Sequence, residues 1–85
     1  MKRTAIVNKD IAVCASLHGE HSSALIEKGT LVQIINKFYN YLIHGYYCRV
    51  SIDGDDKLFF VLPEDLSLTN HEILQLPETK DLKHY

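Results

Sequence analysis

The sequence predicts a mainly β protein that folds as one small barrel of about five strands. Apolar and polar side chains alternate over residues 46–52, which is typical of a strand with one buried and one wet face. Asp53-Gly54 separates this run from a second apolar run at residues 57–62, and this arrangement indicates a hairpin. Pro63 lacks an N–H and cannot continue the ladder, so a single 3-10 turn is expected from Pro63 to Leu66.

Length and composition indicate one ordinary globular domain. The chain has 85 residues, which is the size of a single domain. With 46% hydrophobic and 24% charged residues it has the composition of a folded protein and not of a disordered one. We place the domain at residues 1–76 and expect a flexible C-terminal tail at residues 77–85, because Pro77 ends the last apolar run.

Charge and cysteine content exclude several classes of protein. A net charge of -2 gives no general attraction to nucleic acid or to an anionic membrane. The two cysteines, Cys14 and Cys48, are too few for a disulfide framework. The chain has neither the apolar region of a signal peptide nor the run of about 20 apolar residues that a membrane helix needs. We therefore expect a cytoplasmic protein that does not associate with membranes.

The N-terminal half begins with strand signals. Residues 11–15 alternate in a way that predicts a strand, and both Cys14 and Cys48 are expected on faces that point to the core. Residues 17–23 contain glycine, two serines and two histidines, which predicts a loop. Gly29 gives the following turn a permissive backbone before the chain enters another apolar run.

Residues 30–44 have two interpretations. With a period of two, Val32 and Ile34 face one side and their neighbours the other, which predicts a strand followed by a long aromatic loop or an extended hairpin over residues 36–45. With a period of 3.6, Thr30 would cap a helix that ends near Gly45, giving an alternative α+β fold with a helix at about residues 30–44. The β-branched run favours the strand.

The sequence predicts the secondary structure of residues 67–76 less definitely. Residues 67–69 can add a short final strand. Residues 70–76, with Asn70 placed as an N-cap, form either one helical turn or a strand.

The order of these parts resembles an SH3-like barrel. A first strand, a polar loop, a glycine turn, a second strand, a variable loop, a hairpin and a proline turn follow one another over about two-thirds of the chain. The aromatic residues by which peptide-binding SH3 domains hold polyproline are missing, because the chain has no Trp and Leu66 stands where a Tyr is usual. The resemblance therefore implies a small barrel of adaptor type and disfavours polyproline as its ligand.

An aromatic cluster with basic neighbours is the candidate binding site. Aromatic side chains interleaved with arginine and histidine are common in protein interfaces, so we expect a protein partner on this surface, with the loop at residues 17–23 beside it. The predicted binding residues are Phe38, Tyr39, Tyr41, His44, Tyr46 and Arg49.

Other functions receive less support from the sequence. A nucleic-acid-associated barrel that uses Lys37, Arg49 and the tyrosines stays the alternative, although it is not favoured by the net charge. Cys14, His18, His44 and Cys48 could hold zinc, but they lack the regular spacing of zinc modules, so we predict neither a metal nor a cofactor. Cys48 with His44 nearby is a low-ranked candidate for a cysteine-dependent protein, but a cysteine on the buried face of a strand is usually inert and no pattern indicates an acid–base pair, so we predict no enzyme. Exposed edge strands would allow a homodimer.

Overall fold

The chain is mainly β, as the sequence predicts. The computed structural model describes residues 3–53 and 57–79. It contains the strands β1 (Arg3–Ile6), β2 (Ile11–Leu17), β3 (Glu20–Ile26), β4 (Leu31–Asn40), β5 (Gly45–Ser51), β6 (Leu58–Val61) and β7 (Glu78–Thr79). It also has a 3-10 turn, η1 (Pro63–Asp65), and a short helix, α1 (Asn70–Leu74). Seven strands are thus found where about five are expected, and the strand at β4 excludes the alternative helix.

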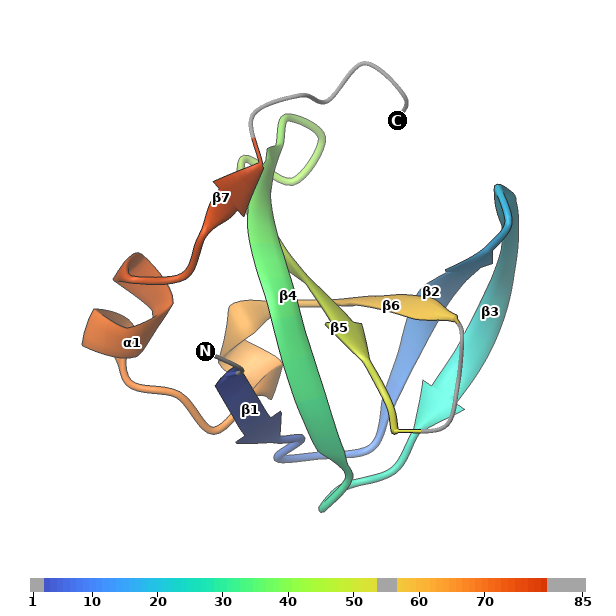
Figure 1. Cartoon of the computed structure of the whole chain (residues 1–85), viewed down its shortest axis with the longest axis horizontal. Helices are drawn as coiled ribbons and strands as arrows, with labels where there is room; N and C mark the ends of the chain where they lie inside the picture. Colours follow the sequence, from blue (N-terminus) through green and yellow to red (C-terminus); the bar gives the residue numbers. More distant parts are fainter. Residues whose placement is uncertain (1–2, 54–56, 80–85) are drawn as a thin grey trace.

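One sheet joins the strands in the order β1-β4-β5-β6-β2-β3, and β7 pairs with β4 off this path. All ladders are antiparallel except that of β7 (Figure 1). An isolated bridge joins Val7 to Leu66, and the N–H of Ser67 donates to the carbonyl of Ile6 at 2.9 Å. These bonds bring the segment after η1 back onto the N-terminal strand, but residues 67–69 do not form the predicted last strand.

The core lies on the inner face of this sheet. Val7, Ala15, Cys48 and Val50 have no exposed surface, and the core also takes residues from β1, β4 and β6. In β5 the alternation of side chains explains which residues are buried, because Cys48 and Val50 point inward while Arg49 points to the opposite face. The predicted inward face of β5 is therefore confirmed.

The segment at residues 17–23 is a hairpin and not a loop. β2 and β3 pair without interruption from Ile11↔Ile26 to Leu17↔Glu20, so only His18 and Gly19 form the turn. Both turn residues have positive φ, 52° and 84°, as a tight two-residue hairpin turn requires. The polar side chains of this segment are tolerated in strands because they are exposed at the edge of the sheet. The hairpin turn predicted at Asp53-Gly54 lies largely outside the residues that the structure describes.

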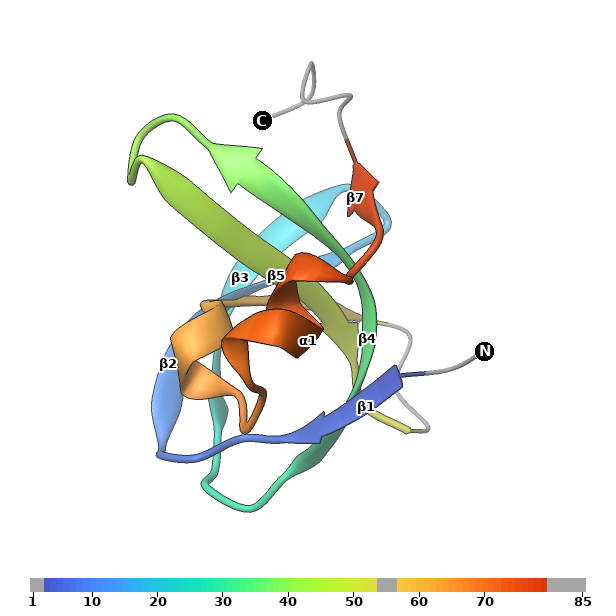
Figure 2. The same ribbon diagram turned by 90° about the vertical axis from the view of Figure 1, so that its left-hand side faces the viewer.

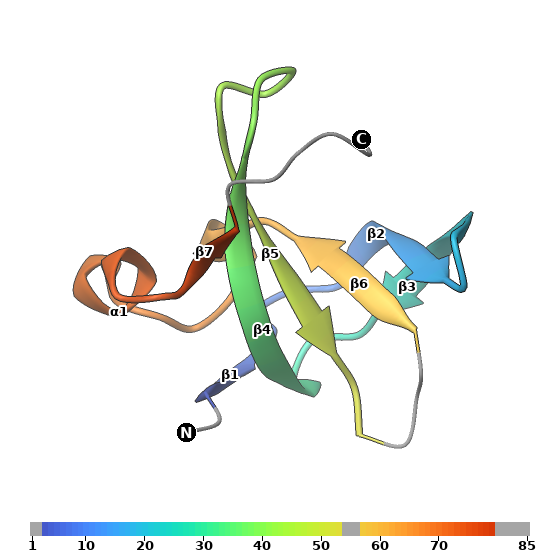
Figure 3. The ribbon, with the colours of Figure 1, turned by 45° about the horizontal axis from the view of Figure 1, so that its top comes forward.

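The C-terminal segment packs against β4 on the side away from β2 and β3 (Figures 2 and 3). The helical alternative for residues 70–76 is confirmed, with Thr69 as the N-cap in place of the expected Asn70. Thr69 and Glu72 form a reciprocal capping box. Glu78 and Thr79, which we assigned to the tail, pair with Lys37 and Phe38 of β4. The remainder of the predicted tail, residues 80–85, is outside the described part.

Candidate functional site

A β-bulge in β4 decides where the aromatic side chains point. The register against β5 shifts between Ile34 and Asn36. Before the shift Ile34 lies opposite Val50 and points into the core, and after it Lys37 lies opposite Cys48 on that same inner face. The bulge thereby moves Phe38 to the outer face, because one extra residue reverses the alternation of every residue that follows.

On the outer face, an aromatic groove separates the β2–β3 hairpin from the β4–β5 hairpin. These two hairpins diverge toward the same side of the molecule in Figure 1. The groove contains a cavity of about 300 Å³. We call it the aromatic groove and define it by the lining residues Cys14, His21, Phe38, Asn40, Tyr47 and Phe60. Its volume is at the lower end of what small-ligand and side-chain pockets show.

Phe38 forms the floor of the aromatic groove. Its ring stacks on Tyr47 at 5.8 Å and meets Phe60 edge-on at 5.8 Å, while the guanidinium of Arg49 lies 5.6 Å from its centroid. Only 2% of Phe38 is exposed. Its neighbours cover most of the ring, so Phe38 contributes to the groove from beneath, whereas Tyr47 and Phe60 stay partly exposed and form the accessible wall.

Asp65 is a further residue that lines the cavity of the aromatic groove. This residue at the end of η1 is 7% exposed, and its carboxylate pairs with the ammonium of Lys9 at 3.1 Å. The ion pair places a compensated negative charge beside the apolar wall.

The second group of aromatic residues lies on the opposite face of the β4–β5 hairpin. Tyr39 contacts Tyr46 at 5.4 Å and Tyr41 at 5.1 Å, both edge-on. The hydroxyl of Tyr46 donates to Glu78 of β7 at 3.2 Å. Partial burial, followed by the charge of Glu78 and this hydrogen bond, raises the pKa of Tyr46 above its ordinary value.

Lys37 is an internal anchor and not a surface charge. Its ammonium donates to the carbonyls of Ile73 and Leu74 at 3.0 and 3.2 Å, and it lies 5.2 Å from the ring centroid of Tyr46. The side chain is 6% exposed. It thus binds the C-terminal end of α1, where free carbonyls and the helix dipole favour a cation.

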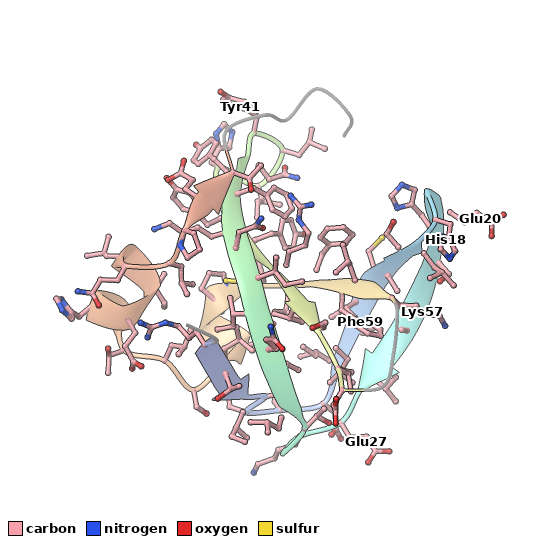
Figure 4. All side chains as sticks on the ribbon, in the orientation of Figure 1. His18, Glu20, Glu27, Tyr41, Lys57 and Phe59 are labelled. Atoms are coloured by element: carbon pink, nitrogen blue, oxygen red, sulfur yellow. The ribbon has the colours of Figure 1, made fainter. Side chains whose placement is uncertain are left out.

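The tip of the β4–β5 hairpin is an exposed apolar surface. Tyr41, Leu42 and Ile43 are 73%, 91% and 43% exposed, and we call these three residues the apolar tip. Figure 4 shows Tyr41 at the end of the hairpin, remote from the core. His44 follows in the turn with a φ of 52° and is also exposed.

The structure therefore separates the six predicted binding residues. Phe38 and Arg49 belong to the face of the aromatic groove, Tyr39 and Tyr46 to the opposite face, and Tyr41 and His44 to the turn between them. The sequence does not single out Cys14 and Phe60 of the groove as binding residues, and it indicates His21 only as part of the segment at residues 17–23 expected beside the binding surface. Their outward alternation in β2, β6 and β3 would have indicated them once both hairpin registers were known.

The cysteine and histidine candidates do not converge. Cys14 is exposed on the outer face, so its predicted burial is wrong, whereas Cys48 is buried as expected. Within residues 3–53 and 57–79, no three histidine, cysteine or acidic side chains gather closely enough to hold a metal ion. No helix in this same part of the chain has the length and apolar character to span a membrane.

No family model, no curated protein and no solved structure matches the chain. The likeness to SH3-like barrels stays a prediction.

Proposed function

We propose that the chain is a non-catalytic binding module, an SH3-like barrel of adaptor type, which holds an extended segment of a protein partner in the aromatic groove. The observation that carries this proposal is the cavity between two hairpins with partly exposed Tyr47 and Phe60 in its wall. Aromatic residues next to arginine are enriched among the residues that dominate binding energy in protein interfaces. Two free thiols suit the reducing cytoplasm in which we place the module.

The shape of the groove supports an extended segment as the ligand. It lies between two hairpins, and the stacked ring of Phe38 forms its base. An apolar anchor from the partner would replace water against Tyr47 and Phe60. The apolar tip stands at the end of the β4–β5 hairpin, outside the residues that line the groove.

A protein partner is favoured over nucleic acid by the position of Lys37. Both donor contacts of its ammonium are to carbonyls of α1, so this cation is not available to a phosphate. Phosphate contacts supply most of the affinity in sequence-independent nucleic-acid binding. The nucleic-acid alternative loses one of its two basic residues in this way.

A random peptide library displayed on phage tests the proposed function. We expect selected peptides to bind the wild-type chain, to lose at least about tenfold in affinity for Tyr47→Ala, and to bind Tyr41→Ala within about twofold. Titration of one selected peptide should shift the backbone amide resonances of Cys14, His21 and Phe60. Circular dichroism confirms that each variant is folded.

Two results would contradict the proposal. One is a library that yields no peptide specific for the chain. The other is a set of peptides that lose affinity for Tyr41→Ala but not for Tyr47→Ala, because such peptides bind the apolar tip and not the aromatic groove.

A further inference from the structure

β3 is an edge strand without the usual protection against pairing. Among the described strands it pairs only with β2, whereas the second side of the N-terminal strand is contacted after η1, where the N–H of Ser67 donates to Ile6 and Leu66 forms a bridge with Val7. Edge strands are commonly blocked by lysine, proline, a bulge or small length. β3 has seven residues, EHSSALI, with neither Lys nor Pro, and its register against β2 has no shift.

At the free edge of β3, every second residue directs its backbone N–H and C=O groups away from β2. In a two-residue hairpin the pair that closes the turn, here Leu17 and Glu20, exchanges both backbone hydrogen bonds. Residues alternate from that pair onward, so His21, Ser23 and Leu25 direct their N–H and C=O groups away from β2. These three residues are exposed, and Leu25 leaves 68% of its surface in solvent.

The charged residues at the two ends of β3 would meet residues of opposite charge in a second copy related by a two-fold rotation. Glu20 and His21 stand at one end, and Glu27 and Lys28 follow the other; Figure 4 shows Glu20 and Glu27 at these opposite ends. An antiparallel copy centred on Ala24 brings Glu20 near Lys28 of that copy and His21 near its Glu27, two residues in the turn that follows β3. The same register sets Ser23 opposite Leu25 and makes the two Leu25 side chains diagonal neighbours.

The geometry points to a homodimer in which β3 of one chain pairs antiparallel with β3 of a second copy around a two-fold axis at Ala24. This register matches outward-facing residues with outward-facing residues, as a ladder requires. It creates two Glu20–Lys28 pairs and covers both Leu25 side chains. None of Glu20, Glu27 and Lys28 forms an ion pair with another described residue, so these charges are available. The dimer requires no ligand in the aromatic groove, although His21 lies at both surfaces.

Sedimentation of the full chain over about 1 µM to about 1 mM tests the dimer. We expect a concentration-dependent dimer that Ser23→Pro abolishes, because the Ser23 N–H faces the second copy and makes no bond to β2. Ser23→Thr keeps this N–H and is the matched control. Amide exchange of Ser23 and Leu25 should slow with rising concentration, while Ser22 and Ala24 are protected at every concentration.

Charge reversal tests the register without a change to the backbone. Glu20→Lys and Lys28→Glu should each weaken dimerisation about three- to tenfold, and the double variant should restore it to within about twofold. A chain that is monomeric at every concentration would overturn the proposal. So would a dimer that is lost in Leu42→Ser but unchanged in Ser23→Pro and in the charge variants, or a double variant that is weaker than both single ones.

Discussion

The two cysteines occupy opposite faces of the sheet and have different chemistry for that reason. Cys48 points into the core with no exposed surface, and Cys14 is exposed on the outer face of β2. Burial raises the pKa of the Cys48 thiol from 9.0 to about 11, and the nearby ammonium of Lys37 counteracts this only in part. The folded state thus favours the neutral thiol at position 48.

This pKa makes stability depend on pH in the alkaline range. Between pH 9 and about 11 the unfolded chain has lost the Cys48 proton and the folded chain retains it. The folded state then binds more protons, so we expect the free energy of unfolding to fall as pH rises, by about 1–2 kcal/mol from Cys48. Urea unfolding across this range measures the slope. Cys48→Ala is the control, and an equal slope in both proteins would contradict the prediction.

At the scale of elements, the bulge in β4 explains most of the difference between the predicted and observed sites. Residues 31–34 alternate as the sequence indicates, with Val32 and Ile34 buried. A single inserted residue near Ile35 then reverses the alternation, which turns Lys37 inward under α1 and Phe38 outward into the groove. Periodicity cannot reveal such a shift, because residues 36–40 carry polar and aromatic side chains that are compatible with either face.

The strands of the core could be predicted, and the edge hairpin could not. Residues 46–52 have apolar positions at every second residue, and residues 58–62 form a continuous apolar run after the Asp53-Gly54 turn signal, so these two strands could be predicted. Residues 20–23 are exposed on both faces and carry no periodic signal. Their strand depends on the two-residue turn at His18-Gly19, and the pairing of β7 with β4 likewise depends on tertiary contacts at Lys37.

The positive φ of Gly19 in the β2–β3 turn can be tested by substitution. Gly19 has a φ of 84°, and a Cβ there would meet no atom within 4 Å. Gly19→Ala should therefore destabilise the chain through backbone strain alone, by about 1 kcal/mol. Gly45→Ala is the matched control, because Gly45 has no positive φ and a Cβ there would meet Ile43 only at 3.9 Å. Urea denaturation compares the two, and equal midpoints would argue against a left-handed turn.

At the scale of the whole molecule, the core extends beyond the strands that enclose it. Leu76, which follows α1, is 4% exposed and belongs to the same buried cluster as Val7 and Val50. The carbonyl of Pro77 accepts from the N–H of Lys37 at 2.8 Å, and the Lys37 ammonium holds α1. Residues 69–79 are thus joined to β4 by packing and by hydrogen bonds, and we expect them to unfold with the sheet.

Leu76→Ala tests this cooperativity against Leu74→Ala, which alters a side chain that is 75% exposed. We expect the buried substitution to lower the free energy of unfolding by about 2–4 kcal/mol and the exposed one to change it by less than about 0.5 kcal/mol. Tyrosine fluorescence and far-ultraviolet circular dichroism should report one shared transition in each protein, since loss of the Leu76 contacts weakens the same core that holds β4 and β5. A Leu76→Ala protein with the wild-type midpoint, or one in which a helical signal is lost before the sheet unfolds, would show instead that residues 69–79 are a separate unit attached to a self-sufficient sheet.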